Sequence, residues 1–372
     1  MKSNSSVSKV AIIGGGLVGR LLAWRLIKQH SNMDNGISFS VNVFEKGSLS
    51  PPSSQNDKAA AFTAAAMISP MSELVASELE IYQLGQTSLT LWPHWLEQLD
   101  CPQHYHQQGS LVLAHPNDIG ELQQFQRDLN HKLSYKLNAQ TDAEAVHILS
   151  DRQQLEAIEP AVHTHFQSGL HLPSEAHLDH DEVLRELVIQ AEVLGVNFNE
   201  NCTIEPDDES LQDYDLIFDC RGMGLKADLK EQSFRGVRGE VIRIECKEIT
   251  LKRPIRLMHP RYKLYIVPKP NNQFIIGATE IESEDRSSIS LRSSMELMSA
   301  LYAVNPAFAE ARIISQDTNL RPAYMDNLPR IEKSTSAFNK PIVRINGLYR
   351  HGYLIGPALV EKAIEKAMVA SL

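Results

Sequence analysis

Three glycines near the N-terminus, Gly14, Gly16 and Gly19, have the spacing G-x-G-x-x-G. They directly follow the apolar run 10–13, which suits a buried strand, and apolar residues recur after them at helical spacing. In such a strand–turn–helix unit the first glycine permits a tight turn, the second lets the backbone approach a pyrophosphate, and the third lets the helix pack on the strand. The spacing therefore predicts a site for the phosphates of a dinucleotide.

A helix N-terminus and a carboxylate complete this pattern. Leu17 and Val18 begin the expected helix, where backbone amides and the positive end of the helix dipole favour a phosphate. A second apolar strand, 40–44, ends in Glu45, and a carboxylate at this point hydrogen-bonds the adenosine ribose. Glu45 lies farther from the glycines than is usual because the polar stretch 31–36 lengthens the loop. We favour this interpretation of Glu45 over that of a solvated strand end.

The composition limits the class of protein that holds this motif. The 372 residues are 42% hydrophobic and 22% charged, which is typical of a globular protein of about two domains. Lys and Arg number 36 against 46 Asp and Glu, so the net charge is -10, and no Lys/Arg-rich block interrupts this acidic background. Nucleic-acid-binding proteins usually have a basic face, so that class is disfavoured.

The cysteines and the N-terminal apolar segment bear on location. The four cysteines form no CxxC pair and no zinc spacing; they lie at 101, 202, 220 and 246. This usage suits a reducing compartment, and we expect the cytoplasm. Arg20, Arg25 and the glycines interrupt the apolar segment 10–27, so it is neither a signal peptide nor a membrane span.

Apolar periodicity predicts the other elements. Helices are expected at 72–99 with a break near Pro93, at about 115–150, from Asp179 or Asp181 to a stop at Gly195, at 294–303 and from Pro357 onward. Strands are expected at 109–114, 215–222, 237–246, 263–268, 274–279 and 342–346. The change to a period of two after residue 236 indicates an antiparallel sheet between α/β segments, with a hairpin turn at 269–273.

The small-residue run 59–67 has two interpretations. Alanine is the best helix former, so the run suits an ordinary helix. Alternatively, small side chains at Ala65, Ala66 and Met67 would let backbone amides come close to a flat cofactor.

Fourteen histidines raise the question of a metal site. Those that lie close together in the sequence are His104, His106, His163, His165, His171, His177 and His180. Most lie in polar stretches without a Cys, Asp or Glu partner at ligand spacing, so we expect solvated surface histidines and no metal.

In their order and spacing, these motifs resemble those of the D-amino-acid oxidase superfamily of FAD enzymes, and within it the glycine oxidases of the thiamine pathway. The resemblance covers nearly the whole chain. It comprises the glycine pattern with Glu45, the Ala-rich run leading to Met67 and Glu73, and the segments 109–112, 236–240, 264–268, 276–280, 320–322 and 349–358.

The resemblance implies an α/β fold of two parts. A Rossmann-like FAD-binding domain of the glutathione-reductase type would be assembled from 1–82, 149–222 and 316–372. An α+β substrate domain with a large antiparallel sheet would consist of 83–148 and 223–315. Because the first domain is assembled from separate segments, residues 1–186 alone should fail to bind FAD.

The resemblance also implies roles for single residues. Arg321 would pair with the substrate carboxylate, Tyr265 would hydrogen-bond the same group, and Arg350 would lie beside flavin and substrate. An arginine fork suits this task because it grips a carboxylate with two hydrogen bonds. From spacing alone, Arg321 fits equally well as a loop residue in a surface salt bridge, and Tyr265 as a cross-strand aromatic. The expected FAD contacts are Gly14, Gly16, Leu17, Val18, Gly19, Glu45, Ala65, Ala66, Met67, Gly222, Arg350, Gly352, Tyr353 and Leu354.

The chain departs from the glycine oxidase pattern at several positions. Ala66 stands where the relatives have the glycine of Ala-Gly-Met. Leu348 and His351 stand in the segment that commonly reads Gly-His-Phe/Tyr-Arg-Asn-Gly, and Leu359 follows where the relatives have Ala-Thr-Gly. FAD contacts are largely to the backbone, so these changes bear on substrate preference rather than on FAD binding.

The implied activity is oxidation of a small amino acid, most simply glycine, to an imine that hydrolyses to glyoxylate and ammonia, with O2 reduced to hydrogen peroxide. No side chain is assigned as a general base. The alternatives are an FAD oxidase or dehydrogenase of sarcosine or D-alanine and, from another class, an RNA-modifying flavoprotein of the same fold. No cysteine follows Cys246, so we expect noncovalent FAD. The family suggests a homotetramer.

Overall fold

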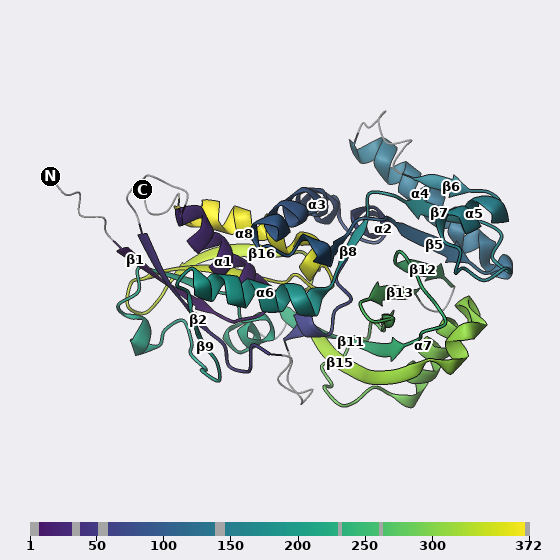
Figure 1. Cartoon of the computed structure of the whole chain (residues 1–372). Helices are drawn as coiled ribbons and strands as arrows, with labels where there is room; N and C mark the ends of the chain where they lie inside the picture. Colours follow the sequence, from purple (N-terminus) through teal and green to yellow (C-terminus); the bar gives the residue numbers. More distant parts are fainter. Residues whose placement is uncertain are drawn as a thin grey trace.

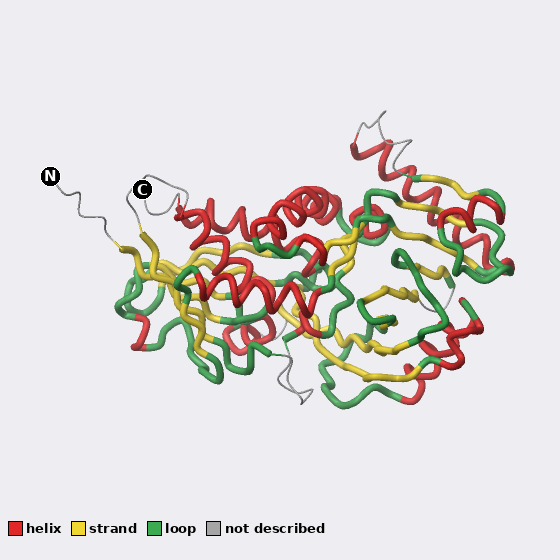
Figure 2. Tube along the Cα trace, viewed as in Figure 1, coloured by secondary structure: helices red, strands yellow, loops and turns green. Residues whose placement is uncertain are grey.

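The computed structural model describes residues 7–31, 38–50, 59–137, 146–229, 233–259 and 263–368. Within these ranges the chain forms a mixed α/β structure with two large sheets, which lie beside each other in Figure 1. Their strands make up most of the yellow segments of Figure 2. The predicted α/β class is confirmed. Most of the loop 31–36 invoked for Glu45 lies outside the described residues.

The first sheet has six described strands in the order β16-β17-β10-β1-β2-β9. Their bounds are β1 Val7–Ile13, β2 Ser38–Phe44, β9 Asn197–Asn199, β10 Leu216–Asp219, β16 Arg330–Thr335 and β17 Pro341–Asn346. All neighbours pair in parallel except β16, which joins the edge antiparallel to β17. A parallel centre with β1 followed by a helix is the arrangement that the glycine pattern requires.

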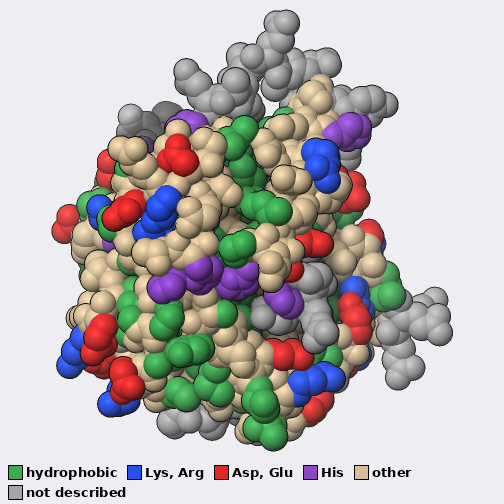
Figure 3. Space-filling view, turned by 90° about the vertical axis from the view of Figure 1, so that its right-hand side faces the viewer, with side chains coloured by type: hydrophobic (Ala, Val, Ile, Leu, Met, Phe, Trp, Pro, Cys, Tyr) green, Lys and Arg blue, Asp and Glu red, His purple; other side chains and the backbone are tan. Residues whose placement is uncertain are grey.

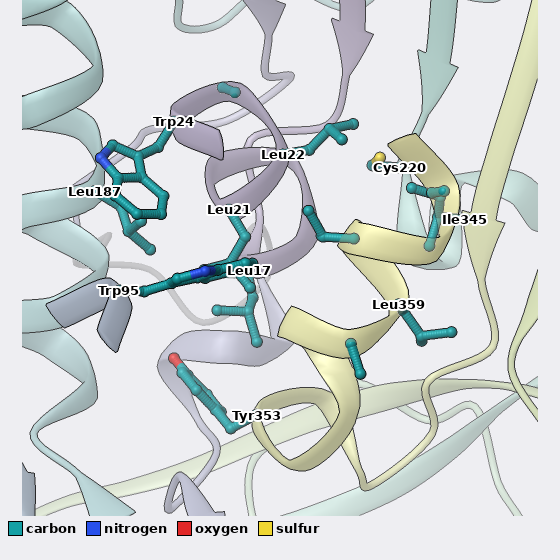
Figure 4. Close-up of a cluster of buried hydrophobic side chains, with 14 of the residues drawn as sticks. Leu17, Leu21, Leu22, Trp24, Trp95, Leu187, Cys220, Ile345, Tyr353 and Leu359 are labelled. Atoms are coloured by element: carbon teal, nitrogen blue, oxygen red, sulfur yellow. The ribbon is translucent and has the colours of Figure 1, made fainter. Parts of the chain in front are cut away.

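The last four residues of β1, 10–13, are buried on both faces of the sheet. Successive side chains of a strand point in opposite directions, so they enter two different clusters. Val10 and Ile12 pack into the large cluster beneath the helices, whereas Ala11 and Ile13 pack into a smaller cluster on the other face. The helices of the large cluster are α1 Leu17–Ser31, α3 Leu79–Gln98, α6 His180–Val193 and α8 Gly352–Met368. Figure 4 shows side chains from all four helices converging, among them Trp24, Trp95, Leu187 and Leu359.

The second sheet has eight strands within the described ranges, in the order β15-β11-β14-β13-β12-β5-β7-β6. Their bounds are β5 Ser110–Ala114, β6 His147–Leu149, β7 Gly169–Leu172, β11 Phe234–Glu245, β12 Ile255–Met258, β13 Lys263–Lys269, β14 Gln273–Gly277 and β15 Arg312–Tyr324. Every pair is antiparallel except β5 with β12. The predicted antiparallel sheet is thus confirmed, but β15, with 13 residues, was not among the predicted strands.

The remaining described elements frame the second sheet and join it to the first. The helices are α2 Pro70–Leu74, α4 Ile119–Leu137, α5 Arg152–Ile158 and α7 Leu291–Val304. A third, small sheet has the strand order β3-β8-β4, with β3 Met67–Ile68, β8 Ala176–Leu178 and β4 Tyr105–His106. No helix in the described ranges is long and apolar enough to span a lipid bilayer.

The helix prediction at 72–99 was wrong about its break. The chain leaves the helical conformation between α2 and α3, and α3 then runs continuously through Pro93. Proline lacks the N–H that would bond the carbonyl four residues earlier, which is that of Leu89. The Tyr105 hydroxyl donates to this carbonyl oxygen at 3.4 Å, so it keeps a partner without the helical bond.

The last helix begins at Gly352, five residues before the predicted start at Pro357. Pro357 leaves the carbonyl oxygen of Tyr353 without its helical donor. The Trp92 indole Nε1 donates to that oxygen at 2.8 Å. A side chain from α3 therefore allows proline within α8, which the local sequence alone does not indicate.

The chain passes between the two large sheets several times. The strands of the first sheet come from the stretches 7–44, 197–219 and 330–346, whereas β7, at 169–172, pairs within the second sheet. The division into domains at the boundaries given above stays a prediction.

Candidate functional site

A single continuous pocket runs from the glycine turn of the first sheet to the inner face of the second, with a volume of about 880 Å³. This volume is toward the upper end of the roughly 300–1,000 Å³ typical of ligand sites. Fifteen of the sixteen expected site residues line it: Gly14, Gly16, Leu17, Val18, Glu45, Ala65, Ala66, Met67, Gly222, Tyr265, Arg321, Arg350, Gly352, Tyr353 and Leu354. Gly19 does not line the pocket and lies behind the turn.

The glycine turn is shaped by close backbone contacts. Gly14 has φ +104°, and a Cβ atom there would lie 2.5 Å from the Cys220 carbonyl oxygen. At Gly19 a Cβ would lie 1.8 Å from the Gly14 carbonyl oxygen, so α1 packs directly on the turn. At Gly16 the nearest atom to such a Cβ is 3.9 Å away, and this side of the turn opens into the pocket. Each glycine thus meets the steric requirement expected of it.

Glu45 lies at the end of β2 and faces this turn. Its carboxylate accepts hydrogen bonds from the Gly15 N–H at 2.6 Å and the Gly47 N–H at 3.0 Å. A carboxylate has about four acceptor positions, so capacity remains for hydroxyl groups in the pocket.

Arg20 supports the turn from within the core, a role that sequence reasoning missed. It is 1% exposed, and its guanidinium donates to the carbonyl oxygens of Gly15, Leu184 and Leu49. Burial lowers its pKa to about 10, against the raising effect of Glu45 and other acidic groups. The signal in the sequence was an arginine inside an otherwise apolar helical stretch.

The Ala-rich run forms no continuous helix, so that interpretation was wrong. Its only helical part is a short 3-10 turn at Ala60–Phe62, and the chain is extended by Met67. Ala66 has φ +57°, a conformation outside the helical region. The run is held by β8, since the Leu178 N–H donates to the Ala66 carbonyl oxygen at 3.0 Å. Pairing with β8 and cover by β13 override alanine's helix preference.

Lys269, at the end of β13, binds the backbone of this Ala-rich run. Its Nζ donates to the carbonyl oxygens of Ala65 at 2.9 Å and Leu178 at 2.5 Å. Burial lowers the pKa of Lys269 to about 7, while Asp179 and Asp181 raise it. The sequence placed this residue only in a hairpin turn.

Tyr265 and Arg321 meet at the other end of the pocket. The Arg321 guanidinium lies flat against Gly239, where a Cβ would come within 2.4 Å of its Cζ. It donates to the carbonyl oxygens of Arg238 and Thr279 at 3.2 and 3.0 Å, and no ion pair is formed by it with a described carboxylate. Arg321 lies on strand β15, so its placement in a loop salt bridge was wrong. Its charge therefore remains available to an anion.

The Tyr265 hydroxyl stays protonated over a wide pH range. Burial raises its pKa, although Arg321 and Arg256 act in the opposite direction. The hydroxyl lies close to Gly277, where a Cβ would be 2.8 Å from it. It can therefore donate a hydrogen bond to a carboxylate held by Arg321.

Arg350 is held by two glutamates. Its Nη2 lies 2.8 Å from Glu73 Oε2, and its Nη1 lies 2.9 Å from Glu280 Oε2. His351 Nε2 and Arg256 Nη2 contact Glu73 as well, each at 3.1 Å. Burial would raise the pKa of Glu73, but Arg350, His351 and Arg256 hold it well below its usual range. Likewise, Arg350 keeps the pKa of Glu280 low despite burial.

The prediction of solvated histidines was wrong for three of them. His171, His177 and His180 are only 7%, 4% and 1% exposed. Burial lowers the pKa of His177 well below its usual range, with Lys269 acting in the same direction, so the ring is neutral and packs like an apolar group. It stacks on the His106 ring with centroids 4.8 Å apart.

Other histidines do gather near the surface, where Figure 3 shows a row of them across one face. His115, His163 and His165 contact one another, with ring centroids 5.2 and 4.7 Å apart along the series. Within the part of the chain that the structure describes, no three His, Cys, Asp or Glu side chains are arranged to hold a metal ion.

The fold and the pocket together define a dinucleotide-binding enzyme with a second sheet closing the far end of its site. Comparison with known proteins agrees. The chain belongs to the DAO family of FAD dependent oxidoreductases, whose model matches residues 9–364. The family resemblance and the dependence on FAD inferred from the sequence are confirmed.

Relatives extend over nearly the full chain. A Rhizobium etli protein, provisionally named as the thiamine biosynthesis oxidoreductase ThiO, is 33% identical over 97% of this chain and 96% of its own length. Glycine oxidase of Bacillus subtilis is 22% identical over 94% of this chain and 90% of its own length. The crystal structure of glycine oxidase from Geobacillus kaustophilus superposes with a TM-score of 0.74 at 21% identity, covering 96% of this chain and 94% of that one.

The residues present fit FAD. Gly16 leaves the turn open at the N-terminus of α1, where backbone amides suit a pyrophosphate, and Glu45 retains acceptor capacity for a ribose. The backbone of Ala65–Met67 lines the middle of the same pocket, where small side chains leave room for a flat ring. Tyr265 and Arg321 line the same pocket.

Proposed function

We propose that this flavoenzyme oxidises the amine of a small amino acid, most simply glycine, with O2 as electron acceptor. One observation carries the proposal: Arg321 lies in the pocket beside Tyr265 without a carboxylate partner among the described residues. An unpaired guanidinium next to a hydroxyl donor suits a carboxylate group. The names of the Rhizobium etli and glycine oxidase relatives support this choice.

The charges at this end of the pocket favour an anion. Glu73 contacts Arg256 and Arg350, and Glu280 contacts Arg350, whereas Arg321 forms no ion pair with a described carboxylate. An amino acid with a neutral amine carries one negative charge, and only the neutral amine has the lone pair that the oxidation uses. The site thus favours the reactive form of the substrate.

The protein's own contribution is position. Bound FAD supplies the acceptor for the two electrons and the hydrogen lost from the α-carbon. Arg321 and Tyr265 fix the carboxylate and so hold the α-carbon at one place in the pocket. Glu73 and Glu280 hold Arg350 between them, which keeps that arginine from competing for the carboxylate in another orientation. No side chain is required as a general base, since the amine arrives neutral.

We propose that FAD is held noncovalently. Among the four cysteines only Cys220 lines the pocket. Its side chain packs with Leu22 and Ile345 in the core (Figure 4), and burial raises the pKa of the thiol well above its usual value. A thiol that stays protonated and faces the core is a poor nucleophile. Acid precipitation should release all yellow colour to the supernatant; colour retained in the pellet would contradict this proposal.

A role in thiamine biosynthesis and a homotetrameric assembly remain predictions. The first is supported by the name of the Rhizobium etli relative. Restored growth of a thiamine-requiring strain that lacks its own glycine oxidase would test it. Analytical ultracentrifugation of the FAD-loaded protein tests the second.

The activity test is a substrate panel. Peroxide release and kcat/KM should be measured with glycine, sarcosine and D-alanine, in air and with an artificial dye as acceptor. Turnover of glycine with peroxide release supports the proposal. Turnover with the dye but not with O2 would indicate a dehydrogenase, and activity only on sarcosine or D-alanine would assign the enzyme to that substrate. The RNA-modifying alternative requires tRNA binding at low salt, which the same preparation can test.

A further inference from the structure

A third arginine, Arg256, lies in the substrate end of the pocket, and neither the family resemblance nor the proposed reaction gives it a task. It lies on β12 directly opposite Tyr265 of β13. Residues paired in this way point to the same face of a sheet. Arg256 lines the pocket, and its charge acts on the Tyr265 hydroxyl together with that of Arg321. Two arginines therefore flank the position expected for the substrate carboxylate.

The hydrogen bonds of Arg256 leave most of its donors unused. A guanidinium has five N–H donors. Among the described residues, Nη2 contacts Glu73 Oε1 at 3.1 Å, whereas Nε is buried and has no hydrogen-bond partner. Arg350 differs, since both of its Nη nitrogens contact a carboxylate, that of Glu280 or Glu73. Arg256 Nε is too buried to meet a ligand, so the donors left for one are those of Nη1 and the second N–H of Nη2, which have no other partner among the described residues.

Glu73 does not explain Arg256 by itself. That carboxylate already accepts from Arg350 and His351 through Oε2, and Arg256 reaches only the other oxygen with one nitrogen. If Glu73 served only as the counter-ion of Arg350, a second arginine beside it would not be needed. Arg256 nevertheless contacts Glu73 and keeps 20% of its side chain exposed. The Arg256 fork therefore retains the donors that grip a carboxylate.

We propose that Arg256 binds a second carboxylate of the substrate, so that the preferred substrates are dicarboxylic amines. The proposal rests on the proposed amine oxidation and narrows its substrate class. The first carboxylate pairs with Arg321 and Tyr265, and the second, carried on the nitrogen substituent or on the side chain, pairs with Arg256. The amine lies between them.

The arginines of the site agree with this class. Arg321 forms no ion pair with a described carboxylate, and Arg256 shares its partner Glu73 with Arg350. At neutral pH a dicarboxylic amine carries two carboxylates and one ammonium group, so its main form has one negative charge. A monocarboxylic amino acid is a neutral zwitterion under the same conditions. The second carboxylate thus adds attraction to the arginines whether the amine is protonated or, as the oxidation requires, neutral.

A binding experiment on the FAD-loaded protein tests the proposal without turnover. Oxydiacetate and methoxyacetate match iminodiacetate and sarcosine but carry an ether oxygen in place of the amine, so neither is oxidised. Titration followed by the flavin absorbance should give a Kd at least about tenfold lower for oxydiacetate, as expected for an added charge-assisted pair. Equal Kd values would overturn the proposal.

Variants assign the preference to Arg256. Arg256→Met should reduce the oxydiacetate preference by about tenfold to a hundredfold, and Arg256→Lys should restore part of it because lysine keeps the charge but not the fork. Arg312→Met, an exposed position on β15, is the matched control and should keep the wild-type preference. A preference that survives Arg256→Met would overturn the assignment. Loss of stability alone would shift both Kd values together.

Kinetics separate failure of this inference from failure of the proposed function. The panel pairs iminodiacetate with sarcosine and D-aspartate with D-alanine, so that the second carboxylate is added on nitrogen or on carbon. A higher kcat/KM for either dicarboxylic member, arising mainly in KM, supports the proposal and identifies which position is used. Oxidation of the monocarboxylic members without this preference overturns the inference alone. Oxidation of neither glycine nor any of these four overturns the proposed function, while the titration still decides the role of Arg256.

Discussion

The two ends of the pocket are formed by different kinds of atoms. At the nucleotide end the decisive features are backbone atoms, namely the turn at Gly14 and Gly16 and the close contact at Gly19. At the substrate end they are charged side chains, with Arg321 on β15 and Glu73 in helix α2. The glycine spacing lies within a few consecutive residues, although Gly14 also contacts Cys220, whereas the charged contacts join elements that are far apart in the chain. Substitutions that add atoms should therefore impair cofactor binding at the nucleotide end, and substitutions that remove charge should impair substrate binding at the other end.

The largest expected effect is steric. Gly19→Ala places a Cβ at 1.8 Å from the Gly14 carbonyl oxygen, so α1 cannot pack on the turn. We expect purified protein to hold little or no FAD, as measured from the ratio of flavin to protein absorbance. Gly120→Ala is the control, since a Cβ there meets nothing within 4 Å. Full FAD content in Gly19→Ala would show that the turn does not position the cofactor.

The next effect concerns charge at the substrate end. Arg321→Met should lower kcat/KM for glycine by about a hundredfold or more, because hydrogen bonds to charged groups contribute about 1.5–3 kcal/mol each and two are lost. FAD content should stay at the wild-type level. Arg330→Met, an exposed position with a local partner in Asp326, should leave the kinetics unchanged. Unchanged kcat/KM in Arg321→Met would show that Arg321 does not bind the substrate carboxylate.

A smaller effect on stability should follow from Glu73→Gln. The substitution leaves Arg256 and Arg350 without their shared counter-charge, and breaking such a buried pair costs about 3 kcal/mol of unfolding free energy. Urea denaturation of the FAD-loaded protein measures it. Glu156→Gln removes an exposed pair with Arg152 and should change stability by about 0.5 kcal/mol or less. Equal losses of unfolding free energy in both variants would mean that the buried ion pairs of Glu73 stabilise the fold no more than an exposed pair does.

The smallest effect joins the two ends, at Lys269 behind Ala65. Its pKa is about 7 in the folded protein against an ordinary value of 10.5. Between these pH values the unfolded chain holds a proton that the folded chain lacks, so this residue makes stability rise with pH in that window. Lys269→Met should remove that part of the slope when urea midpoints are compared from pH 6 to 10. Exposed Lys252→Met should keep it; identical slopes in all three proteins would contradict burial of the amine.

The same division explains what the sequence could predict. The glycine turn, Glu45 and the buried strand β1 follow from short-range spacing, and the structure brings them together as expected. The hairpin of β13 and β14 was likewise predicted, and Asn271 and Asn272 adopt the positive φ that its turn requires.

Features that depend on distant partners were missed. Helix α8 passes through Pro357 because the Trp92 indole takes over a carbonyl oxygen, and no local pattern indicates this. Lys269 and Arg256 gain their places from strand pairing and from Glu73 or Ala65, which lie some 180 to 200 positions away in the chain. Arg256 did carry one signal, as a charged residue inside an apolar strand.

The most direct test of amine oxidation by this protein is anaerobic reduction of the bound flavin by small amino acids, followed at its visible absorbance maximum. This measurement separates substrate oxidation from the choice of electron acceptor. We expect bleaching by at least one small amino acid in the wild-type protein. In Arg321→Met at the same concentration, bleaching should be slowed about a hundredfold or more, with FAD content unchanged. A flavin that stays oxidised with glycine, sarcosine, D-alanine and iminodiacetate alike would contradict this expectation.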